Sequence, residues 1–181
     1  SRKQEVKRML PEMLKVVSDF PEYQFVIGGI SSIGKDFYRR IMGNVDAFLV
    51  EDQTYELLQN SSAAVVTSGT ATLETALFTV PEVVCYKANH FSYLIAKWLI
   101  KVKYISLVNL VMDKAVVKEL IQGELTKDNI MKELDLLLHS GKRQRQILED
   151  YDELRDRLGN AGASEKAATI IVADTRNMKQ E

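Results

Sequence analysis

The sequence predicts an α/β fold in which a parallel sheet is flanked by helices and followed by an all-helical C-terminal segment. Short apolar runs of strand length alternate with helical patterns up to about residue 115. One run, at residues 63–66, is apolar at every position, which indicates a strand covered on both faces. Strands that alternate with helices are joined by right-handed crossovers and form parallel sheets.

The individual elements follow from apolar periodicity and from turn residues. We expect strands at residues 24–28, 47–50, 63–66, 82–86 and 104–107. Helices are expected at residues 3–18, 34–42, 54–59, 71–78 and 91–100, and Thr54 is expected to cap its helix. Only helices are expected further on, at residues 116–121, 127–139, 142–158 and 164–172. We therefore divide the chain into an α/β part at 1–115, helices packed on it at 116–174, and a polar tail at 175–181.

The composition limits the classes of partner that the chain is expected to bind. The chain has 181 residues and a net charge of -1, so there is no overall electrostatic case for nucleic acid. Its single cysteine, Cys85, lies in an apolar run without a basic residue next to it, and we expect a buried side chain and not a nucleophile. We expect neither a signal peptide nor a membrane span. Because Ser1 starts abruptly at a helix entrance, we expect a fragment cut at a domain boundary.

The turn from Thr67 to Glu74 carries the clearest chemical pattern, because it joins a buried strand to a helix. A helix start offers unpaired N–H groups and the positive end of a dipole, which together bind phosphate. Gly69 allows the backbone to approach a ligand, and Ser68 and Thr70 add hydroxyl groups. Glu74 follows one turn later, where its carboxylate can accept two hydrogen bonds from a ribose diol. The alternative is that Ser68 or Thr70 only caps the helix and Glu74 only complements its dipole.

Ligands of parallel sheets bind at the carboxyl ends of the strands. Four predicted turns lie at that edge, at residues 28–32, 51–54, 67–70 and 87–90. His90, in the last of these turns, could contact a phosphate or an acceptor, although a plain surface histidine is the simpler interpretation.

The segment from Thr67 to Glu74 resembles the S-G-T-A-T-L-E segment of bacterial lipid-A-disaccharide synthases. The resemblance covers about two-thirds of the chain, in order and at the right spacing. It continues through residues 81–86, 93–97, 102–107, 109–110 and 116–122, and Ser1-Arg2 resembles the end of the family's P-G-S-R turn. Val108 departs from the pattern, because the family usually has proline there.

The resemblance implies the C-terminal, donor-binding half of a GT-B glycosyltransferase, which has two Rossmann-like domains. The family transfers 2,3-diacylglucosamine from UDP to 2,3-diacylglucosamine 1-phosphate and forms the lipid A disaccharide. The general base belongs to the N-terminal domain, so the resemblance implies no catalytic residue here and an isolated half that is inactive. The implied contacts are Arg2, Ser68, Gly69 and Thr70 for the diphosphate, Glu74 for the ribose, and Asn109, Glu119 and Gln122 for the donor-site lining.

The stretch from residue 83 to residue 112 contains no acidic residue and has an apolar, basic centre. Such a helix suits an anionic membrane surface, and it is also compatible with a buried helix or a dimer interface. The residues concerned are Phe91, Tyr93, Lys97, Trp98 and Lys101. With a lipid substrate, we expect a bacterial cytoplasmic protein peripheral to the inner membrane, with a possible homodimer formed by swapping the helix at 164–172.

Two further patterns are given no role in binding. Asp150-Tyr151-Asp152 is a D-x-D sequence, but residues two apart on a helix point in different directions, so we expect a solvated charged face and no metal. His139 lies near a helix C-terminus, where its charged form suits the dipole. Two other functions remain open: another GT-B enzyme, such as a UDP-N-acetylglucosamine 2-epimerase relative, and a non-catalytic interaction domain.

Overall fold

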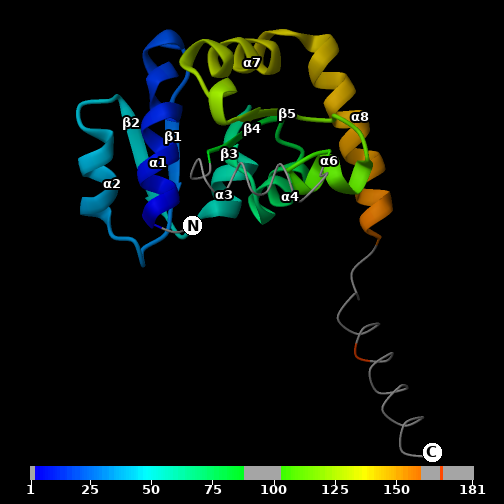
Figure 1. Ribbon diagram of the computed structural model, residues 1–181, viewed down its shortest axis with the longest axis horizontal. Helices are drawn as coiled ribbons and strands as arrows, with labels where there is room; N and C mark the ends of the chain where they lie inside the picture. Colours follow the sequence, from blue (N-terminus) through cyan, green and yellow to red (C-terminus); the bar gives the residue numbers. More distant parts are fainter. Residues whose placement is uncertain (1–2, 88–102, 160–167, 169–181) are drawn as a thin grey trace, which may run out of the picture.

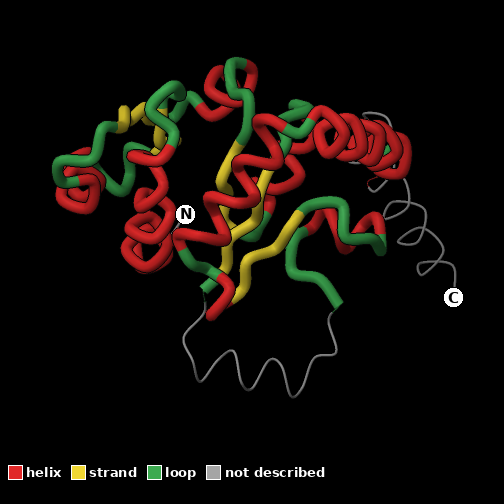
Figure 2. The backbone as a smooth tube through the Cα atoms, turned by 90° about the horizontal axis from the view of Figure 1, so that it is seen from above, coloured by secondary structure: helices red, strands yellow, loops and turns green. Residues whose placement is uncertain are grey.

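The computed structural model describes residues 3–87, 103–159 and 168, and it has the expected α/β architecture (Figure 1). Its strands are parallel and form two small sheets. The first sheet pairs β1 (Phe25–Gly29) with β2 (Ala47–Glu51), and the second has the order β3 (Ala64–Thr67), β4 (Glu82–Tyr86), β5 (Lys118–Ile121). Helices lie around both sheets (Figure 2), so the predicted fold class is confirmed.

The first sheet is covered by the N-terminal helices. They are α1 (Lys3–Met13), the 3-10 helix η1 (Leu14–Asp19), α2 (Lys35–Met42) and α3 (Thr54–Gln59). Apolar side chains of α1, η1 and α2 form one buried cluster with the strands. Tyr38, which is buried, also accepts a hydrogen bond through its hydroxyl from the backbone N–H of Ile30 at 3.1 Å. This bond holds the segment that leaves β1 at its carboxyl end.

The second sheet carries the main core. α7 (Lys127–His139) contacts β4 and β5, whereas α4 (Thr70–Leu77) contacts β3 and β4. α6 (Leu107–Met112), the 3-10 helix η2 (Gln122–Glu124) and α8 (Gly141–Leu158) complete the surroundings. Val83, Val84 and Cys85 of β4 are fully buried, as expected for a central strand of a parallel sheet. No helix in the described ranges is long and apolar enough to cross a membrane.

Three of the predicted elements and one predicted helix cap differ from the structure. Residues 116–121 do not form a helix: β5 occupies Lys118–Ile121, because pairing with β4 overrides an apolar spacing that suits either element. Residues 104–107 do not form a strand, because Ser106 caps α6 and the helix begins at Leu107. Thr54 is the first residue of α3 and not its cap. The helix expected at 3–18 becomes a 3-10 helix from Leu14, three residues after Pro11.

Candidate functional site

The turn after β3 is open to solvent. Thr67 pairs with Cys85 of β4, and the Ser68 N–H donates to the Cys85 carbonyl at 3.2 Å. The chain then turns at Gly69, whose φ of 150° and ψ of -163° are a conformation that essentially only glycine adopts. A Cβ atom built at Gly69 would have no heavy atom within 4 Å. The predicted close approach to the backbone is therefore sterically available.

The start of α4 presents bare hydrogen-bond donors. The N–H groups of Gly69, Thr70 and Ala71 have no hydrogen-bond partner among the described residues. The Gly69 carbonyl, by contrast, accepts from the N–H of Thr72 at 3.2 Å and from its hydroxyl at 2.8 Å. Gly69 and Thr70 are exposed, so the positive end of the helix dipole faces solvent. These donors can bind an anion without any rearrangement of the helix.

The two hydroxyl groups of the turn differ. The Ser68 hydroxyl donates to the Ile105 carbonyl at 2.7 Å, so its hydrogen holds the segment before α6. The Thr70 hydroxyl has no hydrogen bond to a described residue. A ligand can therefore receive a hydrogen bond from Thr70 directly, whereas Ser68 contributes through its position in the turn.

Glu74 lies one helical turn into α4 and is half-buried. It lines a cavity of about 620 Å³ whose wall also includes Thr67, Ala71, Gly28 and Thr54. These residues come from the carboxyl ends of β1 and β3 and from the starts of α3 and α4. The carboxylate makes no hydrogen bond to a described residue, so it is available to a ligand hydroxyl group.

A second ordered turn lies at the carboxyl ends of the strands of the first sheet. The Asp52 carboxylate accepts from the Ser31 N–H at 3.0 Å and joins the segments that follow β2 and β1. Asp52 has a φ of 57°. The hydrogen bonds from Ser31 lower the pKa of the Asp52 carboxyl, so the group is anionic at neutral pH.

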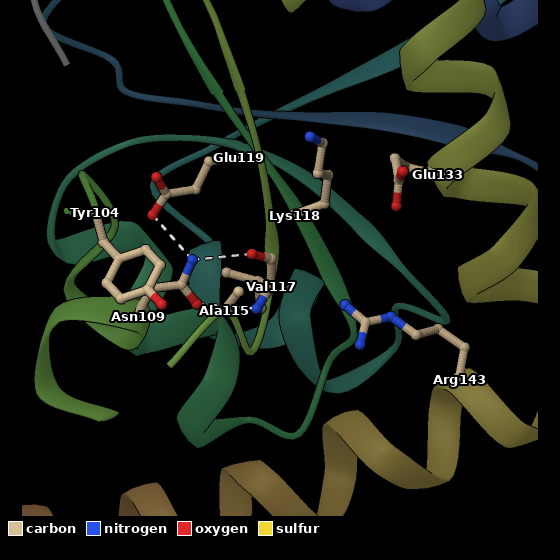
Figure 3. Close-up of a pocket in the computed structure, with 8 residues that line it drawn as sticks. All are labelled: Tyr104, Asn109, Ala115, Val117, Lys118, Glu119, Glu133 and Arg143. Carbon is tan, nitrogen blue, oxygen red and sulfur yellow. Dashed lines mark hydrogen bonds between the residues drawn. The ribbon is translucent and has the colours of Figure 1, made fainter. Parts of the chain in front are cut away.

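Asn109 and Glu119 form a polar junction between α6 and β5 (Figure 3). The Glu119 carboxylate accepts from the N–H groups of Ile105 and Ser106, at 3.0 and 2.8 Å, and from the Asn109 amide at 2.9 Å. The same amide donates to the Val117 carbonyl at 2.9 Å, and its oxygen accepts from the Val117 N–H at 3.0 Å. Both side chains thus hold α6 against the edge strand.

The junction borders a second cavity, of about 310 Å³, lined among others by Tyr104, Lys118, Glu133 and Arg143. Asn109 is buried, and its amide is used inside the protein. The donor-site role expected for Asn109 and Glu119 stays a prediction. Gln122 begins η2 with a φ of 52° and is half-buried, and its role also stays a prediction.

Cys85 is fully buried, and burial raises the pKa of its thiol to about 12, so it is not a nucleophile. The solvated face expected at residues 150–152 is wrong for two of the three residues. Asp150 and Tyr151 are buried, and Asp150 pairs with Lys114 at 2.6 Å, whereas Asp152 is exposed. His139 lies in the last turn of α7, where it contacts Asp135 at 2.9 Å.

Several predicted residues lie outside the described part of the chain. They are Arg2, His90, the expected membrane-contact residues Phe91, Tyr93, Lys97, Trp98 and Lys101, and, except for Ala168, the helix at 164–172. Among the described residues, no group of three or more side chains could hold a metal ion.

The turn expected at residues 87–90 includes Lys87, but the sequence patterns assign Lys87 no role and do not identify its partners Arg8 and Glu12 on α1. The Arg8 guanidinium donates to the Lys87 carbonyl at 3.2 Å, and the Lys87 ammonium lies 3.5 Å from the Glu12 carboxylate. The available signal was the position of Lys87 directly after a predicted strand. The two α1 residues that hold it could not be found, because they lie more than 70 positions away in the sequence.

The fold and the open turn define a Rossmann-like α/β domain of the kind that forms one half of a GT-B glycosyltransferase. The family model for lipid-A-disaccharide synthetase matches residues 1–173, and the chain belongs to this family. It is 40% identical to the lipid-A-disaccharide synthase of Syntrophus aciditrophicus over 179 residues, which are 95% of the chain and 47% of that protein. Identity to the Myxococcus xanthus enzyme is 35%, over 95% of the chain and 46% of that enzyme. The chain therefore spans about half the length of the curated relatives that it matches.

Proposed function

We propose that this chain is the UDP-binding C-terminal half of an inverting glycosyltransferase that forms the lipid A disaccharide. The donor would be UDP-2,3-diacylglucosamine, and the acceptor 2,3-diacylglucosamine 1-phosphate. One observation carries the proposal: three N–H groups at the start of α4 face solvent, one helical turn from the Glu74 carboxylate, and neither feature has a hydrogen-bond partner among the described residues. The first feature fits a diphosphate and the second a ribose diol.

In the proposed reaction the acceptor hydroxyl attacks the anomeric carbon of the donor sugar, and its proton goes to a base in the N-terminal half. The bond between that carbon and the β-phosphate oxygen breaks, and UDP leaves with the electron pair. The amides of Gly69, Thr70 and Ala71 would stabilise the charge that develops on the diphosphate. Arg2, which matches the family's P-G-S-R turn, would add a cation. The amides and cations would take the place of a metal, and we propose no cofactor.

The proposal includes a location on the cytoplasmic side of the inner membrane, because both substrates carry acyl chains. The apolar and basic residues from Phe91 to Lys101 are the proposed contact with anionic lipid. Because the base is supplied by the other half, we propose that the present half alone binds UDP weakly and does not turn over. A homodimer formed by swapping the helix at 164–172 is the proposed assembly.

Calorimetric titration of the full-length protein with UDP tests the proposal. We expect Glu74→Ala to weaken UDP binding by roughly tenfold or more, because hydrogen bonds to a charged group contribute about 1.5–3 kcal/mol. Glu149→Gln on α8 is the matched control, since Glu149 is exposed and lies in a helix that does not line the cavity, and binding should stay unchanged. If UDP binds with equal affinity to Glu74→Ala and to the unmodified protein, Glu74 does not hold the ribose.

The family match favours this function over the 2-epimerase alternative. A non-catalytic interaction domain makes a different prediction, namely a stable oligomer by light scattering that shows no response to UDP. Absence of any UDP binding by the full-length protein would support that function and contradict the proposal.

A further inference from the structure

Lys87 lies beside the open turn because of strand register. Thr67 of β3 is the partner of Cys85 in β4, and the Ser68 N–H donates to the Cys85 carbonyl. Two residues further along the neighbouring chain segments are Gly69 and Lys87. Since adjacent strands lie about 4.8 Å apart, continuing this register beyond the paired residues places the Lys87 backbone near the start of α4.

Contacts from α1 hold Lys87 at this place. The Arg8 guanidinium donates to the Lys87 carbonyl at 3.2 Å and fixes the backbone. The Lys87 ammonium lies 3.5 Å from one oxygen of Glu12, whose other oxygen binds Lys15 at 2.5 Å. The pKa of the Glu12 carboxyl is lowered, first by the hydrogen bond from Lys15 and also by the charge of Lys87. Lys15 alone therefore still neutralises Glu12 when Lys87 moves away.

The turn itself lacks the charge that a diphosphate needs. Residues 68–73 contain no charged side chain, so the α4 amides and the helix dipole supply only partial positive charge. The Lys87 side chain is 38% exposed, and its pairing with Glu12 is long, so the free energy required to release it is small. A flexible lysine stem can then carry a full charge to the neighbouring turn.

We propose that Lys87 is a donor-diphosphate ligand, which exchanges the Glu12 carboxylate for the phosphate oxygens when a nucleoside diphosphate occupies the turn. Arg8 is a positioning residue, because it acts through the Lys87 backbone. This inference rests on the proposed function, since it assigns a further ligand to the same site. A purely structural ion pair between α1 and β4 would instead affect all nucleoside ligands equally.

The test compares ligands that differ only in phosphate number. UDP, UMP and uridine are titrated into the full-length protein, its Lys87→Met variant and its Lys132→Met variant. We expect Lys87→Met to weaken UDP binding roughly tenfold and UMP binding less, with uridine binding within twofold, because the lost interaction is with phosphate charge. Lys132→Met is the matched control, since Lys132 is an exposed lysine of α7 that makes no hydrogen bond or ion pair to a described residue. It should leave all three ligands within twofold.

Equal loss for UDP and uridine in Lys87→Met, or no loss for either, overturns the inference while UDP binding by the unmodified protein still supports the proposed function. If the unmodified protein does not bind UDP, the proposed function itself fails. A double-mutant cycle tests the role of Arg8. Arg8→Gln should weaken UDP binding severalfold on its own and add little to Lys87→Met, whereas full additivity would show that Arg8 acts independently of Lys87.

Discussion

The starts of α6 and α4 are both linked to Ile105 by hydrogen bonds, and they differ in what their N–H groups bind. At α6, the N–H groups of Ile105 and Ser106 donate to the Glu119 carboxylate, so an anion of the protein itself occupies the helix start. At α4, the N–H groups of Gly69, Thr70 and Ala71 have no partner in the described part of the chain. The first helix start is therefore structural, and only the second can take an external anion.

The hydroxyl of Ser68 links the two helix starts. It donates to the Ile105 carbonyl, while the Ile105 N–H donates to Glu119. The satisfied junction thus supports the geometry of the open turn. A polar group predicted to line a ligand site can serve that site by holding its neighbours in place, as a supporting shell does around a preorganised site.

The largest expected effect comes from removing the internal anion. Glu119→Ala leaves the N–H groups of Ile105 and Ser106 and the Asn109 amide without their acceptor. We expect the free energy of unfolding to fall by about 3 kcal/mol, since each unsatisfied buried group costs about 1 kcal/mol or more. Urea unfolding measures it. Glu133→Ala is the control in the same cavity wall, because Glu133 makes no hydrogen bond or ion pair to a described residue, and its effect should stay below about 0.5 kcal/mol.

A third polar group, Glu82, sharpens the comparison, because it is buried without a partner in the described part of the chain. Both carboxyl oxygens of Glu82 lack hydrogen bonds among the described residues, and the residue is 1% exposed. Burial raises the pKa of Glu82 well above the usual value. At a pH between the pKa of the unfolded chain and that of the folded protein, the folded protein therefore keeps a proton that the unfolded chain has lost. The contribution of Glu82 to the unfolding free energy should therefore be most favourable below about pH 4.3 and fall, by at most about 1.4 kcal/mol per pH unit, up to the folded-state pKa.

Glu82→Gln should remove this dependence. Urea unfolding between pH 5 and pH 7 would show the variant gaining stability relative to the unmodified protein as the pH rises, by about 2.7 kcal/mol at most over that interval. Glu149→Gln, an exposed change of the same type, should follow the unmodified protein. Parallel pH profiles for Glu82→Gln and the unmodified protein would mean that Glu82 is already ionised in the fold.

The start of α4 could be predicted from the sequence, whereas the junction at the start of α6 could not. The α4 turn is a local pattern: an apolar strand, a glycine and a helix follow one another within about a dozen residues, and the predicted strand and helix match β3 and α4 closely. The Glu119 junction depends on β5 pairing with β4, and residues 118 and 83 are distant in sequence. The apolar spacing at residues 116–121 suits either a helix or a strand, so local reasoning assigned the wrong element.

The burial of Asp150 escaped prediction for the same reason. Its partner Lys114 lies 36 residues away, so the run of charges at residues 149–153 gave the appearance of a solvated helix face. Helix periodicity did place Asp150 and Asp152 on different faces. Periodicity alone does not show which of these two residues points toward the core.

The smallest of these effects concerns the backbone of the open turn. Gly69→Ala places a Cβ at a φ of 150°, where open space gives no clash but the backbone conformation is strained. We expect the turn to relax, with a loss of about 1 kcal/mol in unfolding free energy and weaker UDP binding, because the amides of Thr70 and Ala71 change direction. Gly123→Ala is the matched control: it also meets open space but lacks a positive φ, and it should change neither quantity measurably. If Gly69→Ala keeps full UDP affinity, the bare amides at α4 are not the phosphate ligands, and the distinction between the two helix starts loses its functional meaning.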